Sequence, residues 1–128
     1  MNGLHLTADL RGCRCQAHWL TDAPALLQAC VARVRATGLQ PVAELAHRFP
    51  GTPQGPGGVT ATVLLAESHL CVHTWPESGS VSLDVYVCNV GDDHSAQAGC
   101  LLAALLDLFD PQTVQRHALQ RGALPSGA

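Results

Sequence analysis

A serine that follows a glutamate, with a histidine five residues further on, is the most reactive arrangement in this sequence. Ser68 follows Glu67 within residues 66–77, and His73 belongs to the same segment. A side-chain hydroxyl can attack the preceding carbonyl to form an ester; loss of the α-proton then leaves dehydroalanine, which hydrolyses to a pyruvoyl group and ammonia. His73 is a suitable base for these steps, and Thr60 is a candidate second hydroxyl. The residue types alone leave open a simpler interpretation, a surface serine and histidine in a hairpin.

The chain contains no lysine, and all seven of its Lys/Arg residues are arginines. An enzyme that forms an imine through a lysine, such as a pyridoxal phosphate enzyme, cannot be built from this chain alone. If the protein performs imine chemistry, the carbonyl group must come from another source.

The overall composition predicts one domain, residues 1–128, with a modest core. The net charge of −3 and the absence of a basic run exclude nucleic acid as an obvious partner. Charged residues interrupt the apolar stretches, and the N-terminus lacks the pattern of a secretion signal. The spacing of the six cysteines is not typical of a disulfide framework. We therefore expect a soluble cytoplasmic protein with free thiols and no membrane partner.

Hydrophobic periodicity predicts the elements that must position these residues. Alternating or β-branched segments indicate strands over residues 4–10, 39–49, 59–66, 70–75, 81–88 and 113–119. Thr21 or Asp22 caps a first helix that ends before Gly38, and a second amphipathic helix covers residues 96–109. The predicted fold class is α+β, a two-layer α/β sandwich in which an antiparallel sheet carries two helices on one face.

Two other functional classes remain open from the residues. Strand alternation places His69, Cys71 and His73 on one face, and Cys13 and Cys15 add thiols, so a zinc-binding module is conceivable. The paired cysteine or histidine knuckles that structural zinc sites favour are missing, and we predict no metal site. A relative that is not cleaved would act only as a non-catalytic, ligand-binding regulatory domain.

Residues 67–77, Glu-Ser-His-Leu-Cys-Val-His-Thr-Trp-Pro-Glu, resemble the processing-site signature of the prokaryotic S-adenosylmethionine decarboxylase proenzymes. These pyruvoyl-dependent enzymes supply aminopropyl groups for spermidine synthesis. Flanking segments resemble the same family in the same order: His5-Leu6-Thr7-Ala8-Asp9, His47-Arg48-Phe49, Gly58-Val59-Thr60 and Asp84-Val85-Tyr86-Val87-Cys88. The resemblance extends from about residue 4 to about residue 121.

The resemblance implies cleavage between Glu67 and Ser68, which yields a β chain of residues 1–67 and an α chain of residues 68–128. Ser68 would become the pyruvoyl group, the only cofactor implied, and would form the Schiff base with the substrate amine. His73 would serve processing, and Thr60 occupies the position of a processing serine. Cys88 would be the proton donor in catalysis, although a small buried core residue is the usual role of a cysteine.

The resemblance also implies a small-molecule substrate. Phe49 would stack on adenine, Trp75 would face a sulfonium through its π cloud, and Glu77 would bind ribose hydroxyls. Some relatives with the same self-processing core decarboxylate L-ornithine or L-arginine instead, and such a pocket needs a carboxylate for the distal cation. Candidate carboxylates are Asp9, Glu77, Asp92 and Asp93.

Family active sites lie where two protomers meet. The resemblance therefore implies a homodimer of processed protomers, in which residues of both chains build each pocket. A domain of this size cannot easily enclose a nucleoside by itself, which agrees with that expectation.

Overall fold

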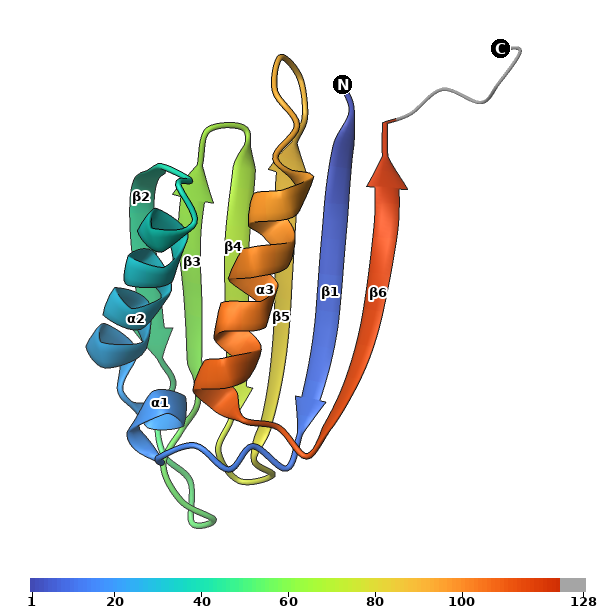
Figure 1. The fold of residues 1–128 in the computed structure, drawn as a ribbon. Helices are drawn as coiled ribbons and strands as arrows, with labels where there is room; N and C mark the ends of the chain where they lie inside the picture. Colours follow the sequence, from blue (N-terminus) through green and yellow to red (C-terminus); the bar gives the residue numbers. More distant parts are fainter. Residues whose placement is uncertain (123–128) are drawn as a thin grey trace.

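The chain forms a single antiparallel sheet covered by helices on one side (Figure 1), in a computed structural model that describes residues 1–122. The elements are β1 (Gly3–Arg11), α1 (His18–Thr21), α2 (Ala23–Ala36), β2 (Pro41–Arg48), β3 (Val59–Leu65), β4 (Ser68–Trp75), β5 (Ser80–Cys88), α3 (Ser95–Phe109) and β6 (Thr113–Arg121). The strand order is β2-β3-β4-β5-β1-β6, so β1 lies between β5 and β6. Every neighbouring pair is antiparallel.

The two long helices begin and end at recognisable signals. The Asp22 carboxylate caps α2 by accepting a hydrogen bond from the Ala25 N–H at 3.0 Å, and Pro24 occupies the first turn. Gly38 follows α2 with a positive φ of 87°, a conformation that glycine adopts without strain. The helix α3 ends at Asp110, which is left-handed with φ 47°.

The core lies between the sheet and the helices, because alternate residues of each central strand point to the helical side. On β5 these are Val81, Leu83, Val85 and Val87, each at most 2% exposed. The helices contribute fully buried side chains to the same core: Leu26 and Val34 from α2, and Leu101, Leu105 and Phe109 from α3. Burial of each such side chain contributes on the order of 1.5–3 kcal/mol relative to exposure, so this layer holds the sheet flat against the helices.

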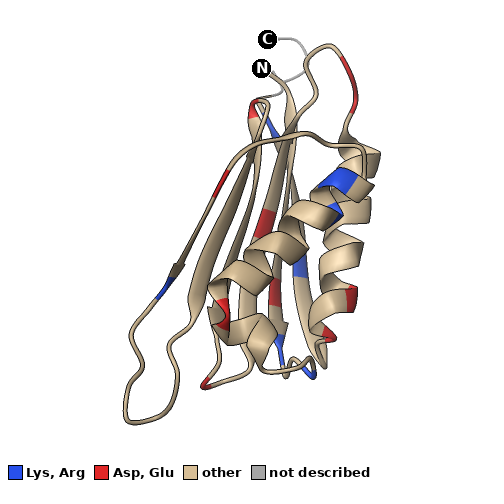
Figure 2. Cartoon of the chain, turned by 90° about the vertical axis from the view of Figure 1, so that its left-hand side faces the viewer, with Lys and Arg blue, Asp and Glu red and all other residues tan. Residues whose placement is uncertain are grey.

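The opposite side of the sheet, which we call the open face, carries the residues that alternate with the core. It includes His47, Thr60, Thr62, His69, Cys71, His73, Asp84, Tyr86, His5, Thr7 and Asp9. Within residues 1–122 no helix packs against this face, and Figure 2 shows the helices gathered on the other side. The open face also exposes large apolar side chains, among them Leu45, Leu64, Trp75 and Leu119.

The predicted fold class and the predicted order of long elements are confirmed. The short helix α1 was not among the predicted elements. Its N-cap, Ala17, makes no side-chain capping bond. Instead, Leu20 is buried and its carbonyl accepts a hydrogen bond at 2.7 Å from the hydroxyl of Thr74 on β4. Tertiary packing therefore holds α1. None of the described helices is long and apolar enough to cross a membrane.

Candidate active site

The proposed cleavage bond lies in the tight turn between β3 and β4. Leu65 pairs with Ser68, so only Ala66 and Glu67 connect the two strands. Glu67 adopts a left-handed backbone conformation with φ 54°, which costs a non-glycine residue on the order of 1 kcal/mol. Strain is therefore stored at the residue whose carbonyl the serine would attack.

The Ser68 hydroxyl is held in place by the neighbouring strand. Its oxygen accepts a hydrogen bond from the backbone N–H of Cys88 at 3.0 Å. Because the bond uses an oxygen lone pair, the hydroxyl proton remains free to be donated. We call Glu67, Ser68 and Cys88 the cleavage cluster. The structure thus brings the predicted nucleophile beside the backbone of Cys88, the residue whose thiol is the predicted proton donor.

A hollow of about 400 Å³ opens beside the cleavage cluster on the open face. Glu67 and Ser68 line it together with His5, His69 and Tyr86, and with Arg121 from β6. His5 comes from β1 and His69 from β4, and both pair in register with Tyr86 on β5. The hollow therefore combines residues from the two ends of the described chain.

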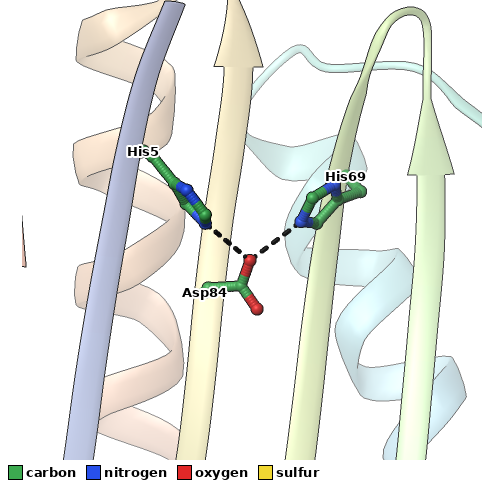
Figure 3. Close-up of side chains that lie close together, drawn as sticks. All are labelled: His5, His69 and Asp84. Atoms are coloured by element: carbon green, nitrogen blue, oxygen red, sulfur yellow. Dashed lines mark hydrogen bonds and ion pairs between the residues drawn. The ribbon is translucent and has the colours of Figure 1, made fainter. Parts of the chain in front are cut away.

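His5 and His69 share one carboxylate oxygen at the wall of this hollow (Figure 3). The Nε2 atom of each ring lies 2.8 Å from Oδ2 of Asp84. The three side chains are 19%, 33% and 26% exposed for His5, His69 and Asp84, so the cluster is partly shielded from water. His5 and Asp84 were not among the candidate site residues, because only the sheet register brings β1, β4 and β5 together.

A second group of predicted site residues gathers at the opposite end of β4. The Thr60 hydroxyl lies 3.0 Å from Nδ1 of His73, across the β3–β4 pairing. Both side chains line a hollow of about 620 Å³ with Phe49, Trp75 and Glu77. We call these five residues the aromatic cluster. The two aromatic rings are about half exposed, at 49% for Phe49 and 44% for Trp75, and are accessible to a ligand.

One chain does not bring the two clusters together. Ser68 and His73 are five residues apart on the same strand. At about 3.3 Å per residue, that spacing separates their backbones by roughly 16 Å. His73 therefore cannot reach the Ser68 of its own chain in this conformation, and its processing role stays a prediction that needs a second source of the histidine.

The remaining candidates lie outside both clusters. Asp9 lines a separate hollow of about 250 Å³ between β1 and β6 with Arg11 and Gln115. Cys71 lies on the open face with its sulfur 3.4 Å from the Thr62 hydroxyl, and burial raises the pKa of this thiol. Neither residue touches the cleavage cluster.

The zinc ligands considered from the sequence do not converge. Among residues 1–122, the one group of histidine, cysteine or acidic side chains close enough to share a metal ion is His5, His69 and Asp84. Of the residues considered from sequence, only His69 belongs to it.

Comparison with known proteins places the chain in one class. The sequence model of the S-adenosylmethionine decarboxylase family matches residues 4–122, so the chain belongs to that family. The resemblance inferred from the motif is thereby confirmed.

Two relatives show how far the similarity extends, and both bear the name S-adenosylmethionine decarboxylase proenzyme. The protein of Methanococcus maripaludis strain S2 is 38% identical over 125 residues, which cover 98% of this chain and 93% of the relative. The protein of Persephonella marina is 32% identical over 124 residues, which cover 96% of this chain and 84% of the relative.

Solved structures share the fold. The adenosylmethionine decarboxylase of Aquifex aeolicus superposes with a TM-score of 0.81 at 28% identity, covering 98% of this chain and 95% of that one. The Trypanosoma brucei AdoMetDC-delta26 monomer superposes with a TM-score of 0.53 at 14% identity. The superposition covers 88% of this chain and 44% of that one. The second similarity concerns the fold alone.

Proposed function

We propose that this chain is a self-processing, pyruvoyl-dependent decarboxylase that acts on S-adenosylmethionine and so supplies aminopropyl groups for spermidine synthesis. The observation that carries the proposal is the geometry of the cleavage cluster. A serine hydroxyl is fixed by the Cys88 N–H next to a strained Glu67, in a chain of this family. The names of the relatives support the choice of substrate.

Processing begins with attack of the Ser68 oxygen on the Glu67 carbonyl carbon. A C–O bond forms, the C–N bond breaks, and the hydroxyl proton ends on the freed nitrogen. Loss of the serine α-proton then expels the Glu67 carboxylate, and water replaces the nitrogen as ammonia. The left-handed conformation of Glu67 favours the first step, because breaking the peptide bond releases its strain.

The residues around Ser68 suit the pyruvoyl group that this chemistry would leave. The Ser68 position lies beside the backbone N–H of Cys88 and borders the hollow of about 400 Å³. The ketone of such a group supplies the electron sink for decarboxylation, a role that no lysine of this chain can take. In this proposal the Cys88 thiol delivers a proton to the substrate carbon.

A homodimer completes the site in this proposal. The predicted catalytic residues are divided between the cleavage cluster and the aromatic cluster, and both clusters border the open face. If two sheets pack through their open faces around a two-fold axis, the aromatic cluster of one protomer can lie over the cleavage cluster of the other. Such packing would also cover Leu45, Leu64 and Leu119, which the single chain exposes.

The aromatic cluster suits a nucleoside that carries a sulfonium. Half-exposed Phe49 and Trp75 offer two π surfaces, and Glu77 adds a hydrogen-bond acceptor at the same hollow. A cation over an indole ring gains about 0.5–2 kcal/mol. A basic amino acid such as L-ornithine or L-arginine has no ring to stack, and would depend on a carboxylate.

The test is release of carbon dioxide by the purified protein from S-adenosylmethionine, L-ornithine and L-arginine, measured side by side. We expect S-adenosylmethionine to be strongly preferred. Trp75→Ala should raise KM for that substrate by about 3- to 30-fold, the loss expected from 0.5–2 kcal/mol. Preference for ornithine or arginine by a cleaved protein would overturn the substrate, and release from none of the three would overturn the activity.

A further inference from the structure

The proposed dimer fixes more contacts than those of its active site, because a two-fold axis moves every residue of the open face together. The axis that brings His73 of one protomer toward Ser68 of the other runs across the strands. It crosses β4 midway between these two residues, next to Cys71. An axis parallel to the strands would instead place the Ser68 ends of both sheets together, far from either His73.

The register of the sheet shows which residues of β1 this axis exchanges. Thr7 of β1 is level with Cys71 of β4, because Asp84 of β5 pairs with both. On β1, His5 lies two residues before Thr7, and Asp9 lies two residues after it. Rotation about an axis at the level of Thr7 therefore places His5 of each protomer opposite the partner's Asp9.

Asp9 carries a carboxylate that the single chain leaves exposed on the open face. Among residues 1–122, the ion pairs engage only the carboxylates of Asp84 and Asp110, although Arg11 borders the same hollow as Asp9. A carboxylate that an interface removes from water needs a cation or hydrogen-bond donors, because desolvation of an unpaired charge is costly. A dimer through the open faces must therefore supply Asp9 with a partner on the facing sheet.

A cation is held at the position that faces Asp9. Arg121 of β6 leans over β1, where its Nη1 lies 2.9 Å from Nδ1 of His5. Its guanidinium carbon lies 5.9 Å from the centre of the Tyr86 ring. The guanidinium has five N–H donors, and most of them remain for an acceptor after the contact with His5. Facing sheets pack about 10 Å apart, a gap that an arginine and an aspartate side chain span together from opposite sides.

Asp84 lies level with the axis and faces its own copy, so two like charges would meet there. Its Oδ2 accepts hydrogen bonds of 2.8 Å from Nε2 of both His5 and His69 (Figure 3). Two N–H donors of its own chain thus satisfy this carboxylate, and it needs no cation from the partner. The same contact orients the His5 ring so that its Nδ1 accepts from Arg121.

We infer that Asp9 of each protomer binds Arg121 of the other, and that these two symmetric ion pairs fix the register in which His73 meets the partner's Ser68. This inference rests on the proposed function. The occupant of the open face is a second copy of this chain, selected by opposite charges at matching positions. Asp9, considered from the sequence as a carboxylate for a basic substrate, is then used by the interface.

Charge reversal in the uncleaved Ser68→Ala chain tests the contact through the Kd of the dimer, measured by sedimentation equilibrium. Asp9→Arg alone and Arg121→Glu alone each create two contacts between like charges, and each should raise Kd by about 10²-fold or more. A mixture of the two variants restores opposite charges at both contacts, so the mixed dimer should form with nearly the original affinity. Both substitutions in one chain should have the same effect.

The matched control is Arg116→Glu, which makes the same change on β6 but on the helical side of the sheet, where Arg116 pairs with buried Ala8. This variant should leave Kd unchanged. With Ser68 intact, Asp9→Arg and Arg121→Glu should each cleave slowly in a timed gel assay. Co-expression of the two should return cleavage to nearly the wild-type rate, because the register is restored.

Several results would overturn the inference. Single variants that dimerise as tightly as the Ser68→Ala chain would do so, as would mixtures that bind no more tightly than the single variants. A Ser68→Ala chain that stays monomeric, or restored dimers that cleave no faster than the single variants, would also contradict it. A wild-type chain that dimerises through this contact but never cleaves would overturn the proposed function and leave the interface in place.

Discussion

Complementation between two inactive chains tests whether each site is built from two protomers. The perturbation is co-expression of a Ser68→Ala chain with a His73→Ala chain, in equal amounts and with different tags. The roughly 16 Å between these residues on β4 excludes direct contact within one chain. In a mixed dimer, however, the intact Ser68 of one chain can meet the intact His73 of the other.

The expected magnitude follows from two-fold symmetry. Random pairing makes about half of the dimers mixed, and each mixed dimer contains one complete site and one doubly damaged site. About half of the His73→Ala chains, and so about a quarter of all chains, should be cleaved. Each variant expressed alone should remain intact.

In the matched control, mixed dimers lose cleavage and do not gain it. Wild-type chains are co-expressed with chains that carry both substitutions, so a mixed dimer offers the wild-type serine no histidine. Only wild-type pairs then process, and cleavage of the wild-type chains should fall to about half. Intact-mass spectrometry of the separated tags gives both fractions. Mixed dimers that contain no cleaved chain, or a control in which every wild-type chain is cleaved, would refute the shared site.

Three further predictions concern single residues. Glu67→Gly removes about 1 kcal/mol of backbone strain and should slow cleavage up to about 5-fold in a timed gel assay. The control is Asp110→Gly, at the other left-handed non-glycine position of the described residues, which should leave the cleavage rate unchanged. Cys88→Ala should still process, because its backbone N–H anchors the serine, but should release carbon dioxide about 10²-fold more slowly; full activity would remove the thiol as proton donor. Burial raises the pKa of Cys30 to about 12, so its thiol should react slowly with iodoacetamide at neutral pH, and exposed Cys100 should be labelled first. Peptide mapping of the labelled protein measures this order, and early labelling of Cys30 would contradict the packing of α2.

Much of the fold was accessible from the sequence because its signals are local. Alternation along residues 81–88 gave β5, and the cap at Asp22 with Pro24 behind it gave the start of α2. The four-residue helix α1 was missed, since it has no side-chain cap and depends on the Thr74 hydroxyl of a distant strand.

The site was less accessible because its geometry is set by sheet register. Ser68 and His73 are only five residues apart in the sequence, but the extended conformation of β4 holds their side chains far from each other. His5 and Arg121 lie near opposite ends of the described chain and meet only because β1 pairs with β6. A regular polar position on β1 gave no sign that His5 would meet a carboxylate on β5.

The central claim is that Ser68 cleaves its own chain and becomes a pyruvoyl group. Intact-mass spectrometry of the freshly purified wild-type protein tests it most directly. We predict two species: residues 1–67 with a free carboxylate at Glu67, and residues 68–128 lighter than the serine-terminated peptide by one ammonia. A single species with the mass of the unbroken 128-residue chain would contradict the account.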